Sequence, residues 1–204
     1  MIAIEATGLV RDFGKVRAVD HVSFSVARGE IFGFLGPNGA GKTTTVRMLT
    51  MLLDPTAGNV VIGGYDIRRQ PYQARWQIGL VPEESNIYTE LSGWDNLMFS
   101  SRLYRVPSSE RTERATELLR AFDLYEKGQV KAQHYSKGMR RRLTIAMALI
   151  HRPSILFLDE PTSGLDVRSA QTIKESVRDL NAGGTTVFLT THQIEEANQL
   201  CDRV

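Results

Sequence analysis

A glycine-rich segment at residues 36–44 has the residue types and the spacing to hold phosphate groups. It contains a glycine, four variable residues and then Gly-Lys-Thr, placed between a predicted strand and a predicted helix. Glycines let successive main-chain N–H groups turn toward phosphate oxygens, and the positive end of the following helix dipole adds to the attraction. The residues expected to bind nucleotide here are Gly36, Pro37, Asn38, Gly39, Ala40, Gly41, Lys42, Thr43 and Thr44.

Two side chains of this loop have more specific expected roles. Lys42 would bridge the outer phosphates, and the Thr43 hydroxyl would bind Mg²⁺. The alternative interpretation is a glycine-rich turn with a solvated lysine. The flanking strand and helix make that alternative the weaker one, and the segment predicts a nucleotide site.

Two adjacent carboxylates follow a short apolar run and predict a place for the metal and an attacking water. Asp159 and Glu160 come directly after residues 155–158, and the carboxyl ends of parallel strands are where such sheets place ligand groups. Asp159 can hold Mg²⁺ through the water shell of the metal, and Glu160 can polarise a water that attacks the γ-phosphate. Two acids that merely cap a strand before Pro161 are the alternative. The sequence lacks an Asn-Lys-x-Asp segment for guanine, which favours ATP over GTP.

Residues 135–143, Tyr-Ser-Lys-Gly-Met-Arg-Arg-Arg-Leu, resemble the signature motif of ABC ATPases. The family pattern is Leu-Ser-Gly-Gly-Gln before a basic helix start, so Ser136 and Gly138 match and the other three positions depart. Ser136 would cap a helix whose N-terminus faces an anion, and Gly138 would let the main chain come close. An ordinary helix N-cap is the alternative. The order of the motifs supports the resemblance, because the acidic pair and a D-loop-like Ser-Gly-Leu-Asp at residues 163–166 follow.

The resemblance covers residues 4–204 and implies roles for three further residues. His192 stands where the family has a histidine that contacts the γ-phosphate and the attacking water, so the expected catalytic residues are Lys42, Glu160 and His192. Phe13 takes the place of the aromatic ring that stacks on adenine, although an early-strand ring is often part of a core. Glu83 replaces a glutamine that touches Mg²⁺, so the expected metal ligands are Thr43, Asp159 and Glu83. The added negative charge at Glu83 predicts slower hydrolysis or altered coupling.

The same resemblance implies two protein partners and a cellular location. Two copies would meet head to tail, with Ser136 and Gly138 of each copy facing the ATP and Mg²⁺ bound by the other. Opening and closing of this dimer would drive a separate membrane-spanning subunit, docked on residues 83–94, where Asn86, Tyr88 and Trp94 look exposed. The protein would then be cytoplasmic, on the inner face of the cell membrane.

Glu83 and the Ser-Lys-Gly-Met signature at residues 136–139 together resemble an exporter branch that includes drug-resistance and antibiotic-efflux ATPases. An importer ATPase is one alternative. A nucleotide-gated ATPase that acts on ribosomes or DNA without transport is another, and the absence of a second cassette or a long coiled coil disfavours it. The transported substrate cannot be named from this sequence, because the membrane partner would select it.

Composition fits a globular domain with no nucleic-acid partner. The 204 residues are 42% hydrophobic and 24% charged, with a net charge of +2, which is too small to predict binding to a polyanion. The basic run at residues 140–142 lies within one helical turn without aromatic neighbours, so we expect a solvated helix face. A single cysteine, Cys201, fits a reducing compartment. No apolar run approaches the ~20 residues that cross a bilayer.

The segments that must position these motifs alternate between strand and helix patterns, which predicts an α/β fold with a parallel sheet. Strands are predicted at residues 2–9, 22–26, 31–35, 78–81, 155–158 and 186–189, and a hairpin at 58–67. Helices are predicted at residues 43–52, 166–180 and 193–203, with Ile194, Ala197 and Cys201 buried on the last. By resemblance, residues 1–204 form one P-loop NTPase domain. It would have a RecA-like core, a small antiparallel β region near the N-terminus and a helical subdomain at residues 91–150, with further C-terminal strands expected after Val204.

Overall fold

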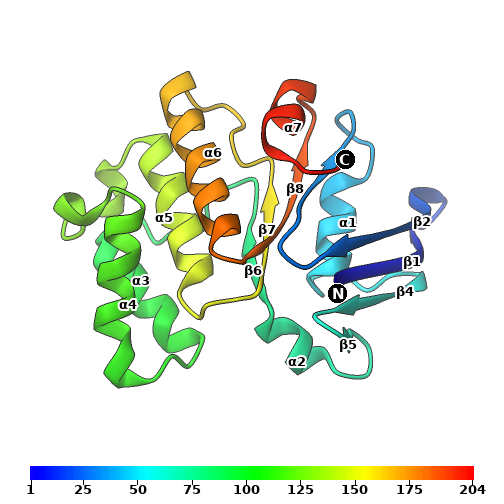
Figure 1. Ribbon diagram of the computed structural model, residues 1–204, viewed down its shortest axis with the longest axis horizontal. Coiled ribbons are helices and arrows are strands. Elements are labelled where there is room, and N and C mark those ends of the chain that lie inside the picture. The colour runs from blue at the N-terminus through cyan, green and yellow to red at the C-terminus, as the bar shows by residue number, and fades with distance from the viewer.

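The computed structural model describes residues 1–204 and is built around a four-stranded parallel sheet (Figure 1). Its strands lie in the order β3 (Ile31–Leu35), β8 (Thr186–Thr191), β7 (Ile155–Asp159), β6 (Ile78–Val81). All residues of β7 and β8 are buried. Near-continuous apolar strands of this kind form where helices or a second sheet cover both faces.

A second four-stranded sheet is antiparallel and contains most of the first third of the chain. Its order is β2 (Val16–Ala27), β1 (Ile2–Phe13), β4 (Ala57–Ile62), β5 (Tyr65–Asp66). β1 and β2 extend beyond their apolar centres because each continues the ladder of its partner up to a turn at Gly14. The helix α1 (Lys42–Leu49) lies between the two sheets in Figure 1.

The remaining helices cover the parallel sheet. A helical group of α3 (Gly93–Leu103), α4 (Ser108–Ala121) and α5 (Lys137–Leu149) stands on the side away from the antiparallel sheet (Figure 1). Two 3₁₀ turns, Tyr125–Lys127 and Ala132–His134, connect α4 to α5. The short α2 is Pro71–Trp76, α6 is Val167–Ala182 and α7 is Ile194–Leu200. None of these helices combines the length and the apolar character needed to cross a membrane.

Strand β7 separates two hydrophobic cores because alternate side chains point to opposite faces. Leu156 and Leu158 join the core shared with α5 and α6, whereas Ile155 and Phe157 join the core shared with α1 and the antiparallel sheet. Phe157 packs on Phe188 with ring centroids 5.3 Å apart. The end of β7 is therefore fixed from both sides.

The predicted fold class is confirmed. Local differences from the prediction occur at the C-terminal helix and at α2. The helix at the end is shorter than 193–203, since residue Cys201 is extended and the next N–H, of Asp202, donates to the Ile31 carbonyl. Ile194 was expected to be buried, and that was wrong: it opens the helix and is 64% exposed. Helix α2 had not been predicted, because a six-residue helix is too short to display a clear apolar period.

Candidate nucleotide site

The glycine loop connects β3 to α1 and has a main chain that only glycine can form at one critical point. Gly41 is the N-cap residue of α1 with φ 88°, and a Cβ built on it would lie 2.4 Å from the Ala18 carbonyl oxygen. No side chain caps this helix. The first N–H groups of α1 are thus left for an anion, which is the arrangement that holds phosphate at a helix N-terminus.

The Lys42 side chain folds back over this loop. Its Nζ donates to the carbonyl oxygens of Gly36 at 2.8 Å and Pro37 at 3.1 Å. The same Nζ lies 3.2 Å from Oε1 of Glu160, and both side chains are only 7% exposed. The loop lysine and the carboxylate predicted to polarise water are therefore an ion pair in this structure.

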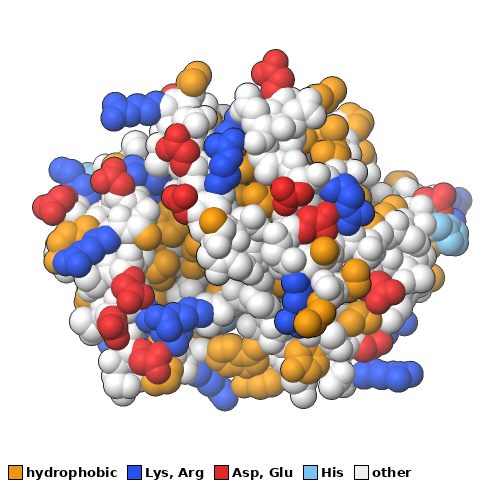
Figure 2. Space-filling model, in the orientation of Figure 1, with side chains coloured by type: hydrophobic (Ala, Val, Ile, Leu, Met, Phe, Trp, Pro, Cys, Tyr) orange, Lys and Arg blue, Asp and Glu red, His pale blue; other side chains and the backbone are white.

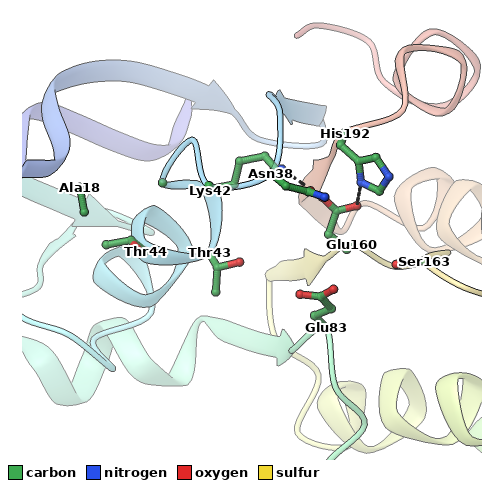
Figure 3. A pocket seen from close by; sticks show the side chains of 11 residues that line it. Ala18, Asn38, Lys42, Thr43, Thr44, Glu83, Glu160, Ser163 and His192 are labelled. Carbon is green, nitrogen blue, oxygen red and sulfur yellow. Dashed lines mark hydrogen bonds and ion pairs between the residues drawn. The ribbon is translucent and has the colours of Figure 1, made fainter.

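Glu160 is held at the end of β7 by both its main chain and its carboxylate. It is a non-glycine residue with φ 47°, a conformation that costs of order 1–3 kcal/mol and that functional sites often retain. Its N–H donates to the Thr190 hydroxyl at 3.0 Å, and its Oε2 lies 2.9 Å from Nδ1 of His192. Figure 3 shows the Glu160 carboxylate between Lys42 and His192.

These residues line one cavity of about 370 Å³. Its wall consists of Ala18, Asn38, Gly39, Gly41, Lys42, Thr43, Thr44, Glu83, Glu160, Ser163 and His192. Glu83 faces it from the loop after β6, across from Thr43 (Figure 3). The cavity thus joins the glycine loop, the end of β7, the loop after β6 and the residue after β8, four segments that are far apart in the sequence.

Oxygen atoms that could hold a magnesium ion lie on the side of the cavity nearest β6 (Figure 3). Thr43, Glu83 and Asp159 together line an adjoining hollow. Asp159 is 3% exposed, and its Oδ1 accepts a hydrogen bond of 2.6 Å from the Thr190 hydroxyl. No group of three His, Cys, Asp or Glu side chains could enclose a metal by itself. A hydroxyl and carboxylates fit Mg²⁺ completed by phosphate oxygens and water.

Phe13, Ser136 and Gly138 lie in other parts of the structure, outside this cavity. Phe13 ends β1, is 48% exposed and packs under the Arg11 guanidinium, 4.6 Å from its ring centroid. Ser136 is the N-cap of α5, and its Oγ accepts from the Met139 N–H at 3.2 Å. Gly138 contacts α6, where a Cβ would lie 2.5 Å from the Ser169 Oγ. Of the loop residues, Gly36, Pro37 and Ala40 do not line the cavity, although the first two hold Lys42.

Two residues that support the site had not been predicted to do so. Glu196 is 2% exposed and accepts hydrogen bonds of 2.6 Å from the Thr162 and Thr191 hydroxyls, which join the segment after Glu160 to the segment before His192. Arg141 was expected on a solvated face, and that was wrong, since it is 4% exposed. Its neighbours on both sides in sequence are basic, so the run gave no signal that one member was buried.

Residues expected to be exposed in the proposed docking segment also need one correction. Asn86 and Tyr88 are exposed, whereas Trp94 is half-buried against the core of the helical group. The three histidines other than His192 differ from one another in burial. His151 is buried, and its Nε2 bonds the Ile78 carbonyl at 3.0 Å, while His21 and His134 are exposed.

Comparison with known proteins gives one family. The family model described as ABC transporter matches residues 19–163. The chain is 47% identical to the daunorubicin resistance ATP-binding protein DrrA3 of Streptomyces coeruleorubidus, over 99% of this chain and 64% of that protein. It is 42% identical to the linearmycin resistance ATP-binding protein LnrL of Bacillus subtilis, over 98% of this chain and 65% of that protein. The chain therefore spans a little less than two thirds of these relatives.

Solved structures agree with the sequence comparison. The structure of an ATP binding subunit of an ABC transporter superposes with a TM-score of 0.87 at 31% identity, over 99% of this chain and 85% of that one. A dimeric, post-hydrolysis state of the ATP-binding cassette MJ0796, bound to ADP and Pi, superposes with a TM-score of 0.84 at 28% identity, over 95% of this chain and 90% of that one.

Proposed function

The chain belongs to the ABC transporter family, and from that membership we propose that it binds ATP with Mg²⁺ and hydrolyses the γ-phosphate bond to drive export. The observation that carries the proposal is the position of Glu160, whose buried carboxylate lies between Lys42 and His192 at the wall of the glycine-loop cavity. A carboxylate held there can polarise a water, and an ammonium beside it can neutralise phosphate charge.

The chemistry follows from these contacts. ATP would place its phosphates on the free N–H groups of α1, and Lys42 would exchange its pair with Glu160 for the outer phosphate oxygens. Glu160 would then orient the water whose oxygen attacks the γ-phosphorus, while the bond to the bridging oxygen of ADP breaks. His192, from the end of β8, would hold Glu160 and the transferred phosphoryl group in place. Thr43, Asp159 and Glu83 would hold Mg²⁺, which neutralises phosphate charge when bound.

We propose that the complete site needs a second copy of this chain. Ser136 is exposed at the start of α5 and Gly138 is buried there against α6, and both lie outside the cavity that holds Lys42 and Glu160. A helix N-terminus capped by Ser136 suits an anion presented from outside the chain. A head-to-tail pair would place this helix start against ATP bound by the partner copy, and the dimeric form of the structural relative MJ0796 supports such a pair.

We also propose a membrane-spanning partner that docks at residues 83–94. Beside this segment lies an apolar hollow lined by Tyr88, Phe99, Leu103 and Tyr104, among others. The Tyr88 and Phe99 rings meet edge to face with centroids 4.8 Å apart, and both are exposed. Figure 2 shows acidic and basic side chains interspersed over the face it displays, without a basic stripe that would favour nucleic acid. Pull-down of the partner at wild-type level after charge reversal across residues 83–90 would contradict this docking site.

The relatives favour export over the other transport directions. They include drug-resistance ATP-binding proteins and a Nod factor export ATP-binding protein. The protein would therefore work on the inner face of the cell membrane, and its membrane partner would select the substrate.

The experiment that tests the proposal is phosphate release by the purified protein in its full natural length. Wild type should release phosphate from ATP only with Mg²⁺. The variant Glu160→Gln should lose roughly 10²–10⁴ in rate, the range for removing a catalytic proton acceptor. That variant should also accumulate as a nucleotide-bound dimer in size-exclusion chromatography. A wild-type protein without phosphate release, or a monomeric Glu160→Gln variant in saturating ATP and Mg²⁺, would overturn it.

A further inference from the structure

Arg141 is a buried arginine whose side chain joins two loops of the nucleotide site without touching the cavity through which nucleotide enters. It lies in the second turn of α5 and is 4% exposed. Its Nη1 donates to the carbonyl oxygens of Pro82 and Glu83, which belong to the loop after β6. Its Nη2 and Nε donate to the carbonyl oxygens of Asp159 at 2.7 Å and Pro161 at 2.9 Å, at the end of β7.

The guanidinium keeps its charge in spite of this burial. Loss of hydration lowers the pKa of Arg141 to about 10, although the charges of Asp159, Glu83 and Glu196 oppose that change. A pKa there still leaves the group protonated near neutral pH. A buried cation of this kind is stable only while its acceptors stay in place, because each unmet donor costs free energy in a low-dielectric interior.

The shape of the guanidinium allows it to fix the position of one loop relative to the other. A guanidinium is planar, and its donors point in fixed directions. One edge bonds the loop that carries Glu83, and the other bonds the strand end that carries Asp159 and Glu160. The two loops cannot move apart without breaking hydrogen bonds to a charged donor, which are about twice as strong as neutral ones. Since Arg141 belongs to α5, the same side chain also ties the helix that begins at Ser136 to both loops.

We propose that Arg141 is a positioning residue for ATP hydrolysis, which fixes Glu83 and the α5 helix start relative to the carboxylates of Asp159 and Glu160. This inference rests on the proposed ATPase function and adds a residue to it. Arg141 would not contact the nucleotide, because Lys42 and the glycine loop lie on the other side of β7's end and share none of its hydrogen bonds. Its loss should therefore change the rate of the chemical step more than the binding of ATP.

The test compares Arg141→Gln and Arg141→Lys with Arg114→Gln in the full-length protein. Arg114 is the matched control, since it is also largely buried and donates to a carbonyl, that of Ile150, but lies on α4 away from the cavity. In Arg141→Gln, kcat should fall roughly 10- to 100-fold, the loss expected when catalytic groups shift by about 1 Å. The Kd of the fluorescent analogue mant-ATP should stay within about threefold of wild type, because uniform binding is retained.

Two further measurements separate positioning from simple destabilisation. Hydrogen exchange at residues 82–87 should quicken in Arg141→Gln while exchange in the glycine loop stays as in wild type. Arg114→Gln should lower Tm but leave kcat and that exchange unchanged. Arg141→Lys keeps the buried charge and so remains foldable if the glutamine variant does not. Its single nitrogen cannot span both loops, so its kcat should fall as well.

The inference is overturned if Arg141→Lys or Arg141→Gln retains wild-type kcat, or if kcat and mant-ATP affinity fall together in proportion to the loss of Tm. These outcomes differ from a failure of the ATPase proposal. In that case the wild type itself would release no phosphate, and Glu160→Gln would behave as wild type.

Discussion

Lys42 and Glu160 form a buried ion pair, with 3.2 Å between Nζ and Oε1, across the two segments predicted to bind phosphate and to polarise water. The other carboxylate oxygen of Glu160, Oε2, lies 2.9 Å from Nδ1 of His192. Under the proposed function ATP would separate Lys42 and Glu160, because the lysine would move to the phosphates and the carboxylate to the attacking water. The pair would therefore compete with nucleotide.

We predict that Glu160→Gln binds mant-ATP more tightly than wild type. Because the variant lacks the competing ion pair and one negative charge, its free energy of binding mant-ATP should be more favourable by about 1 kcal/mol. This corresponds to roughly a fivefold lower Kd. Fluorescence titration measures it. Glu195→Gln, an exposed neighbour on α7, is the control and should leave Kd unchanged. A weaker affinity in Glu160→Gln would show that the carboxylate helps to hold ATP instead.

Thr190→Val should destabilise the fold, because one buried hydroxyl bonds both predicted acids. Its Oγ1 donates to Asp159 and accepts from the Glu160 N–H. The Glu160 N–H would keep its bond to the Thr190 carbonyl, but the buried Asp159 Oδ1 would lose its donor. That loss costs about 1–3 kcal/mol, measurable by urea denaturation. Thr116→Val removes an exposed hydroxyl that bonds only its own helix, so its change should stay within about 0.5 kcal/mol. Equal stabilities for the two variants would contradict this account of Thr190.

Substitution at Gly41 should be worse than the same substitution at Gly39. Both have positive φ, +88° and +80°, but an added Cβ would meet the Ala18 carbonyl only at Gly41. Gly39→Ala should cost about 1–2 kcal/mol from the left-handed conformation alone. Gly41→Ala must also move the loop, so its Tm and its mant-ATP affinity should fall further. Indistinguishable Tm values would count against the close approach of residues 18 and 41.

His151 should make the protein less stable as the pH falls below neutral. Burial lowers the pKa of His151. Protonation would place a second N–H at the buried Nδ1, which has no hydrogen-bond acceptor beside it. The unfolded chain binds the proton more readily, so stability is complete above the ordinary histidine pKa of about 6.5 and is lost as the pH falls through it. Carboxylates with lowered pKa, such as Glu30 and Asp66, lose their contribution only at lower pH.

Urea denaturation at pH 7.5, 6.5 and 5.5, values chosen around that pKa, tests this. His151→Gln should flatten the decline, whereas His134→Gln, at an exposed site, should leave it as in wild type. A decline of the same slope in all three proteins would exclude His151 as its source.

The parts of the site that could be predicted are those marked by a short motif or by a position that the family resemblance indicates. Local spacing indicated the glycine loop and the acidic pair after β7, and the resemblance indicated His192. The structure brings the loop, Glu160 and His192 together at one cavity, with Asp159 at an adjoining hollow. Phe13 stays a prediction for adenine stacking, since it lies outside that cavity on the exposed end of β1.

Burial of single polar residues could not be predicted in the same way. Helical period places Met139 and Leu143 on one face and suggested solvent for Arg141, but α5 is buried at Gly138 and Arg141 as well as at every residue from 143 to 149. The spacing of apolar residues identifies the buried face of a helix only when the opposite face is exposed to solvent. Trp94 and Ile194 were misassigned for the converse reason, because neighbours distant in sequence decide which side of a helix start is covered.

Strand β7 has a consequence for how the protein would fail under heat. Its side chains anchor in two unrelated hydrophobic interiors, and the carboxylates stand at the seam where those interiors meet. If either core unfolds first, the end of β7 shifts and the carboxylates lose their alignment. Catalysis should therefore disappear at the melting temperature of the less stable core, while the more stable core still gives the spectroscopic signal of folded protein.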